Sequence, residues 1–158
     1  MNTNVVLALA VGIGIVAGLR SLTAPAVVSW MAYLHVIDLR GSHLSFMGST
    51  AAVAVFTLLA LLELVGDKLP KTPSRTAAVG LTARILMGAL SGGAFARADG
   101  VSSKLGAVAG IVGALIGAYG GYQVRTRTVK ALHAPDYVIA LLEDAVAIGG
   151  GILLALLL

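Results

Sequence analysis

Long apolar stretches, separated by short polar segments rich in glycine, proline and charge, make up most of this chain. A helix that crosses a membrane needs about 20 mostly apolar residues, and five stretches approach or reach that length. Apolar runs of this kind, with few charges inside them, are typical of membrane helices. The five expected spans are Val5–Leu19, Thr50–Gly66, Ala77–Ala96, Leu105–Val124 and Pro135–Leu157.

A sixth apolar stretch, Leu22–Ile37, follows the first one after a break. Pro25 prevents one smooth helix from running through this point, because proline lacks a backbone N–H and clashes with the preceding turn. Ser21 or Thr23 could cap a new helix that has Pro25 in its first turn. The stretch therefore predicts either a short span or a re-entrant helix.

Six spans would allow a three-plus-three inverted repeat, since each half would then cross the membrane an odd number of times. The tetrapeptide Ala-Leu-Leu-Glu occurs at 60–63 and again at 140–143, and Arg20 has Arg84 as a loose counterpart. Inverted repeats are common in transporters, which place the substrate site between the two halves. Sequence rich in Leu, Ala and Gly also produces such echoes by chance, so the repeat is a hypothesis.

Polar segments connect the expected helices. Lys and Arg are slightly more numerous around residues 68–75 and 125–130 than in the segments on the opposite side. Cytoplasmic loops carry an excess of Lys and Arg, so this small bias favours a cytoplasmic position for these two segments. The connections are the loop Asp38–Ser49, the proline-containing turn Leu69–Thr76, the short turn Arg97–Lys104 and the basic segment Arg125–Ala134.

The composition agrees with a single membrane domain over residues 1–158. Hydrophobic residues make up 58% and charged residues only 11%, against about 25% charged in soluble domains, and the mean hydropathy is +0.97. The first apolar run has no Lys or Arg before it, and Arg20 stands where a signal peptide would have small residues. We therefore expect a retained first helix, not a cleaved signal.

Several classes of chemistry lack their usual sequence features. The chain has no cysteine, and its histidines, His35, His43 and His133, have no metal-ligand spacing. No nucleotide-binding fingerprint or nucleophile motif occurs, and the net charge of +4 comes from scattered residues. We expect no cofactor, no metal and no nucleic-acid partner, and an enzymatic activity has no support.

Ionisable residues inside apolar stretches are the candidates for a functional site. Each costs about 2.5–3.5 kcal/mol at a bilayer centre on insertion scales, so such groups usually face the bundle interior or a watery cavity. Glu63 and Asp67 share one helix face, and Glu143 and Asp144 lie two turns into the last span. The candidate substrate-binding residues are Arg20, Ser21, Thr23, Glu63, Asp67, Lys68, Arg75, Arg84, Glu143 and Asp144.

Each candidate also has a plain structural interpretation. Arg20, beside a helix N-terminus with hydroxyls nearby, suits an anion site, or it extends to the membrane interface. Glu63 and Glu143 are expected to handle protons or cations, or to pair with an arginine. Glu143 or Asp144 would form a buried pair with Arg84 or Arg20, or take part in a relay. Asp67, with Lys68 and Arg75, would orient or gate at the surface, or form a structural ion pair.

A row of glycines lines one face of the span Leu105–Val124. The glycines follow each other at spacings of four, three, four and four, and small residues at such spacing let helices approach closely in membranes. We expect tight packing through this face, and a homodimer formed by it. The row comprises Gly106, Gly110, Gly113, Gly117 and Gly121, with Gly88, Gly92 and Gly93 as a second set.

Three segments, 18–30, 63–76 and 135–150, together resemble the domain-of-unknown-function family 4126, small bacterial integral membrane proteins. The stretch Asp-Lys-Leu-Pro-Lys-Thr-Pro-Ser-Arg-Thr at 67–76 is the most specific part, and the resemblance covers nearly the whole chain. It implies residence in the bacterial cytoplasmic membrane and no particular activity. The polar motif residues are Arg20, Ser21, Glu63, Asp67, Lys68, Thr72, Ser74, Arg75, Asp136, Glu143 and Asp144, with Pro70 and Pro73.

The sequence therefore predicts an all-α polytopic transmembrane bundle that works as a small transporter or channel. An anionic solute coupled to protons or cations fits the charged interior best. A lipid-handling protein that binds phosphate headgroups with its basic residues is an alternative. So is a structural scaffold in which every buried charge is simply paired. Membrane lipid and a small solute or ion are the expected partners.

Overall fold

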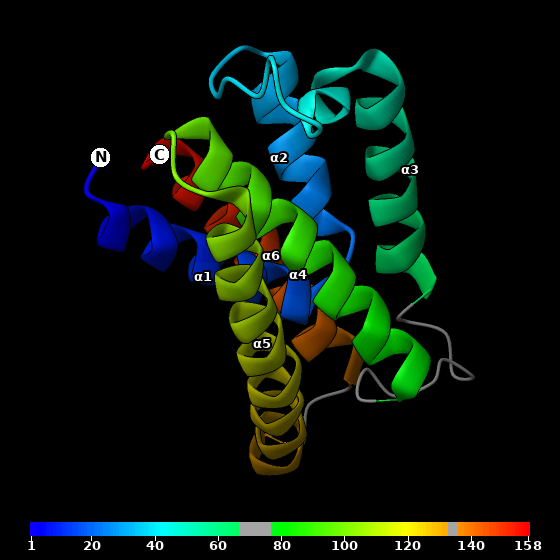
Figure 1. Ribbon diagram of the computed structural model, residues 1–158. Coiled ribbons are helices and arrows are strands. Elements are labelled where there is room, and N and C mark those ends of the chain that lie inside the picture. Colours follow the sequence, from blue (N-terminus) through cyan, green and yellow to red (C-terminus); the bar gives the residue numbers. More distant parts are fainter. Residues whose placement is uncertain (67–76, 133–135) are drawn as a thin grey trace.

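The chain folds into a bundle of helices in the computed structural model, which describes residues 1–66, 77–132 and 136–158 (Figure 1). No strand occurs in these ranges, so the expected all-α class is confirmed. The elements in chain order are α1 (Thr3–Leu19), α2 (Thr23–Tyr33), the short 3-10 helix η1 (Ser45–Gly48), α3 (Thr50–Gly66), α4 (Ala78–Ala98), α5 (Ser103–Leu132) and α6 (Asp136–Leu156).

Three helices, α4, α5 and α6, are long and apolar enough to cross a membrane, which indicates an integral membrane protein. α1 and α3 are apolar but have 17 residues each, roughly 25 Å at 1.5 Å per residue, less than the roughly 30 Å of a hydrocarbon core. The five spans expected from the sequence are therefore not confirmed as five full-length membrane helices.

The expected break after the first helix is present. Leu19 ends α1, Arg20 is extended with φ −138° and ψ 106°, and α2 begins at Thr23 with Pro25 in its first turn. α2 has 11 residues, roughly 16 Å, so Leu22–Ile37 is too short a helix to span. The helix α2 ends at Tyr33, shortly before His35, whose φ of 60° does not fit a continuing right-handed helix.

The fifth helix differs from the expectation, because α5 continues through residues that we expected to be a basic connection. It runs from Ser103 to Leu132, 30 residues, while the sequence predicted an end at Val124. No proline or glycine stands between 125 and 132, so nothing in this part of the chain interrupts the helix. α5 consequently reaches beyond the other helices at its C-terminal end (Figure 1).

The expected glycine row packs α5 against two helices of the same chain. Cβ atoms added at Gly110 and Gly106 would overlap the carbonyl oxygens of Gly88 and Gly92 in α4, respectively. One added at Gly113 would overlap the carbonyl oxygen of Val11 in α1. This close packing is confirmed, but the face expected to make a dimer is already covered inside one chain.

Small residues face inward and large apolar residues face outward in α6. Leu142, Val146 and Leu153 are exposed by 59%, 63% and 59%, which suits contact with lipid, where large apolar side chains need no burial within the protein. Apart from Ile139 and one acid, the buried positions are small, and five of them recur every three or four residues: Ala140, Asp144, Ala147, Gly151 and Ala155.

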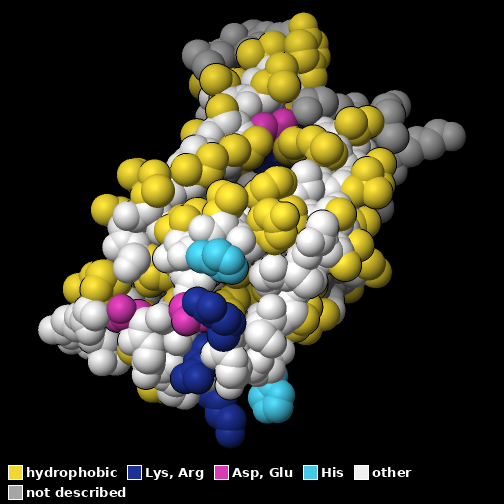
Figure 2. Space-filling view, turned by 90° about the horizontal axis from the view of Figure 1, so that it is seen from above, with side chains coloured by type: hydrophobic (Ala, Val, Ile, Leu, Met, Phe, Trp, Pro, Cys, Tyr) yellow, Lys and Arg dark blue, Asp and Glu magenta, His cyan; other side chains and the backbone are white. Residues whose placement is uncertain are grey.

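The connections and chain ends gather at the two ends of the bundle. At one end the amino group of Met1 lies 2.7 Å from Asp99, just after α4, and the loop 38–49 lies beside the start of α5. Seen from this end, Lys, Arg and His side chains gather in one part of the face with acidic side chains nearby, and hydrophobic side chains cover much of the rest (Figure 2).

Candidate functional site

The α1–α2 junction, defined here as residues 18–22, is the point on which charged side chains from three other helices converge. Glu63 reaches it from α3, Arg84 from α4 and Asp144 from α6, and the junction contributes Arg20 itself. The chain breaks here because Pro25 cannot be deep inside a helix, and the break leaves backbone groups without helical partners.

Arg20 is completely buried and forms an ion pair with Asp144. Its Nη2 lies 2.6 Å from Oδ1 of Asp144, and the two side chains are 0% and 9% exposed. Asp144 lies on the buried face of α6, in register with Ala140 and Ala147. The sequence left open which acid of the last span pairs with which arginine; the structure pairs Asp144 with Arg20, and the buried Arg20 does not extend to the interface.

Glu63 caps the junction with its carboxylate. Oε1 accepts hydrogen bonds from the Ser21 amide at 2.8 Å and the Ser21 hydroxyl at 2.7 Å, and Oε2 accepts one from the Leu22 amide at 2.8 Å. The expected cap by Ser21 or Thr23 was wrong: the N-cap position is Leu22, with no side-chain cap of its own. A carboxylate from another helix takes that role and lies near the positive end of α2.

Arg84 holds the other side of the junction. Its Nε donates to the Gly18 carbonyl at 3.0 Å, and its Nη1 donates to the Gly80 carbonyl at 3.1 Å. The Gly18 carbonyl belongs to the last turn of α1, where carbonyls lack helical donors. A guanidinium therefore caps the end of α1, and a carboxylate caps the start of α2.

Glu143 lies apart from the junction, at the contact between α5 and α6. Its Oε2 is 3.6 Å from Nη1 of Arg125, with side chains 10% and 17% exposed. Adjacent helical residues point about 100° apart, so Asp144 faces the core while its neighbour faces α5. The sequence analysis expected Glu143 to handle protons or cations or to pair with an arginine; in the structure Asp144, and not Glu143, lies at the junction.

The other candidates divide into two groups. Thr23 is buried in the first turn of α2, next to the junction. Asp67, Lys68 and Arg75 lie outside the described residues, so their expected surface role stays a prediction. Among the residues that the structure describes, no group of three His, Asp or Glu could hold a metal ion.

Sequence reasoning missed the backbone groups of the site and one basic partner. The Leu22 amide and the Gly18 carbonyl are bound by side chains more than 40 and 60 residues away along the chain, and no local pattern indicates such a contact. Arg125 was assigned to a connection. The missing helix breaker between Val124 and Leu132 could have placed it on the helix.

A buried ion pair, a bound carboxylate at a helix start and long apolar helices define the class of this chain: an α-helical membrane protein with charged groups buried in an apolar core. The chain belongs to the family described as "Domain of unknown function (DUF4126)", which it matches over residues 7–158. Comparison with curated proteins and with solved structures gives no match.

Proposed function

We propose that this protein is a small membrane transporter for an anionic solute, coupled to protons, with the α1–α2 junction as its anion site. The observation that carries the proposal is the position of Glu63. Its carboxylate already occupies two backbone amides and a hydroxyl at the start of a short internal helix. These donors suit any carboxylate-like or phosphate-like anion equally well.

The coupling follows from the charge of Glu63. An ionised Glu63 fills the donors and keeps another anion out by repulsion. A protonated Glu63 loses its negative charge, so a solute anion can accept hydrogen bonds from the Ser21 and Leu22 amides in its place. The Glu63 carboxyl then carries a proton each time it leaves the junction donors or returns to them. Discontinuous helices whose N-termini point at anionic substrates are a common device of transporters.

Arg20 and Asp144 form the fixed part of the proposed site. The Arg20 guanidinium attracts an anion toward the junction, and Asp144 offsets its charge when no solute is present. Arg84 keeps the end of α1 in place through the Gly18 carbonyl. These groups set the position of the break, and the Glu63 carboxylate is the member that a solute anion would displace.

We further propose that α1 and α2 form a re-entrant pair in the bacterial cytoplasmic membrane, while α4, α5 and α6 cross it. The start of α1 lies beside Asp99, and the loop after α2 lies beside the start of α5. Both outer ends of the pair are thus at the same end of the bundle. The inverted repeat stays a hypothesis: α2 and α5 differ greatly in length, with 11 and 30 residues.

The test is ion flux into liposomes that contain the purified protein and a pH-sensitive dye. We expect a chloride, nitrate or inorganic phosphate gradient to drive proton movement above that of empty liposomes. Glu63→Gln keeps the shape but cannot ionise, so proton movement should fall at least tenfold while anion flux persists. Asp38→Asn, in an exposed loop at one end of the bundle, is the control and should behave as wild type.

A structural scaffold is the second candidate, because the charges at the junction are bound within the protein. On that interpretation Glu63→Gln lowers the unfolding temperature and nothing else changes. Absence of anion-driven flux in the wild type, or unchanged proton coupling in Glu63→Gln, would contradict the transporter proposal and favour the scaffold.

A further inference from the structure

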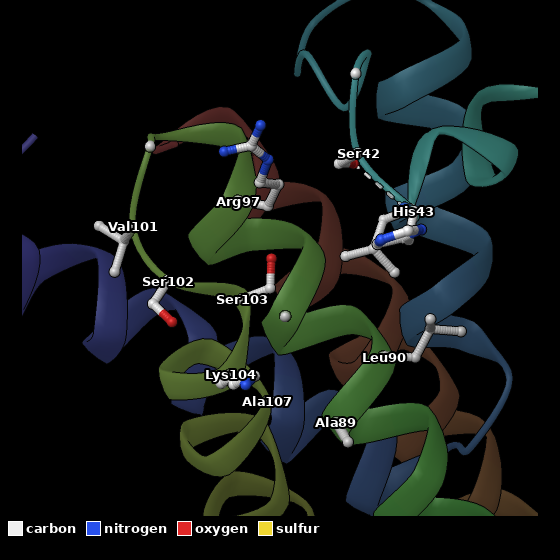
Figure 3. Close-up of a pocket in the computed structure, with 14 residues that line it drawn as sticks. Ser42, His43, Ala89, Leu90, Arg97, Val101, Ser102, Ser103, Lys104 and Ala107 are labelled. Atoms are coloured by element: carbon white, nitrogen blue, oxygen red, sulfur yellow. Dashed lines mark hydrogen bonds between the residues drawn. The ribbon is translucent and has the colours of Figure 1, made fainter.

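A pocket of about 640 Å³ opens where α4 ends and α5 begins, with the loop 41–44 as its opposite wall. Figure 3 shows side chains from these three segments around it: Arg97 from α4, Ser103 from the start of α5 and His43 from the loop. Pockets for small ligands measure about 300–1,000 Å³. The pocket is therefore large enough for a ligand, and none of the junction residues lines it.

The charge of the pocket is positive. Arg97 stands in the last turn of α4 and Lys104 in the first turn of α5, and both line it. No carboxylate does so among the described residues. The acids nearest in the fold bind elsewhere: Asp99 pairs with the Met1 amino group, and Asp38 with Arg40.

Uncharged hydrogen-bond donors also favour an anion in this pocket. The Gly106 amide donates to the Ser102 carbonyl at 3.1 Å, so the amides of Ser103 and Lys104 precede the first helical hydrogen bond of α5. Ser102 and Ser103, which carry hydroxyl groups, also line the pocket. A multivalent oxyanion such as phosphate matches two cations, hydroxyls and a helix start together.

Besides Ser42, His43 and three glycines, the remaining lining is apolar. Leu44, Ala89, Leu90, Val101 and Ala107 form it, and Leu44 and Leu90 also pack against the hydrophobic core. α4 and α5 are both candidate membrane spans, so this pocket lies where their apolar surfaces end. A ligand with a phosphate and an attached apolar chain satisfies both kinds of lining.

We propose that this pocket binds a phosphate-bearing anion, held by Arg97 and Lys104. An anionic phospholipid headgroup and a soluble phosphate ester share this chemistry. The lipid source agrees with the apolar wall and with the position at the end of two membrane helices. The site is separate from the junction and does not depend on the transport proposal.

Native mass spectrometry of the protein from micelles doped with phosphatidylglycerol or with phosphatidylcholine tests the site. We expect wild type to retain phosphatidylglycerol preferentially. One Lys or Arg near a membrane surface contributes modestly to binding of anionic lipid, so Arg97→Gln and Lys104→Gln should each weaken retention about fivefold. Retention by the double variant should be about 25-fold weaker if the free-energy effects of the two substitutions add. Arg40→Gln is the matched control, a basic residue of the same end that does not line the pocket.

A second arm adds glycerol 3-phosphate or inorganic phosphate and follows thermal unfolding. Stabilisation by these solutes that Arg97→Gln and Lys104→Gln remove would support the phosphate site with a soluble ligand as its source. Preferential lipid retention without that stabilisation would support the lipid source. Equal retention by wild type, the double variant and Arg40→Gln, with no solute effect, would overturn the proposal, since general surface charge would then explain lipid binding.

Discussion

Asp144→Asn should lower the free energy of unfolding by about 3–5 kcal/mol, because it leaves the buried Arg20 guanidinium without its opposing charge. The arginine is fully buried and only 2.6 Å from Oδ1 of Asp144, so water cannot replace the lost carboxylate. For a chain of this size that loss corresponds to a fall of roughly 6–20 °C in unfolding temperature. Thermal unfolding in detergent, followed by the fluorescence of Trp30, measures it.

Replacement of both partners separates stability from function. Arg20→Met combined with Asp144→Leu removes both charges and keeps apolar volume, so most of the lost stability should return. If the junction is an anion site, this stable double variant should show no anion flux. Asp38→Asn breaks an ion pair whose side chains are 78% and 62% exposed, and it should leave the unfolding temperature unchanged. An unchanged temperature for Asp144→Asn would show that this pair does not hold the junction.

Gly110→Ala should destabilise the protein by about 1–3 kcal/mol, although alanine is the better helix former by about 1 kcal/mol. An added Cβ would overlap the Gly88 carbonyl oxygen across the α4–α5 contact. Because the obstructing atom is backbone, no side-chain rotation relieves the overlap, and the two helices must move apart. Unfolding by a graded denaturing detergent measures the loss.

Gly120→Ala, in the same helix, is the matched control. Nothing lies within 4 Å of a Cβ added there, so only the gain in helix propensity acts, and stability should stay equal or rise by up to about 1 kcal/mol. Equal effects of the two substitutions would contradict the packing of α4 on α5. Light scattering of the purified protein tests the homodimer expected from the sequence: if the glycine row formed it, Gly110→Ala would give folded monomers and not a destabilised protomer.

The helical class and the positions of the breaks could be predicted from sequence, because they depend on local physics. A run of about 20 apolar residues specifies a membrane helix wherever it occurs, and Pro25 breaks a helix through its own ring. Boundaries were less certain. α5 continues beyond Val124, because basic residues alone do not end a helix and no proline or glycine follows before Leu132.

Half of the candidate residues meet at one place in the structure, in an arrangement that the sequence did not predict. Arg20, Ser21, Glu63, Arg84 and Asp144 all meet at the junction, as expected for ionisable groups that lipid would exclude. Their partners were partly wrong, because a charge can be satisfied by a backbone amide or carbonyl as well as by an opposite charge. Glu63 accepts hydrogen bonds from backbone amides, and Glu143 forms an ion pair with Arg125.

By itself, then, the sequence determined that this is an all-helical membrane protein with a few charges that must be buried, and that its first apolar region is broken near Arg20. Only the tertiary structure decided that Asp144 and not Glu143 meets Arg20, that Glu63 caps α2, and that the glycine row packs against α1 and α4 of the same chain. The physical reason is distance along the chain. Hydropathy and helix breaking act within a turn or two, whereas these contacts join residues that only the packing of α1 to α6 brings within bonding distance.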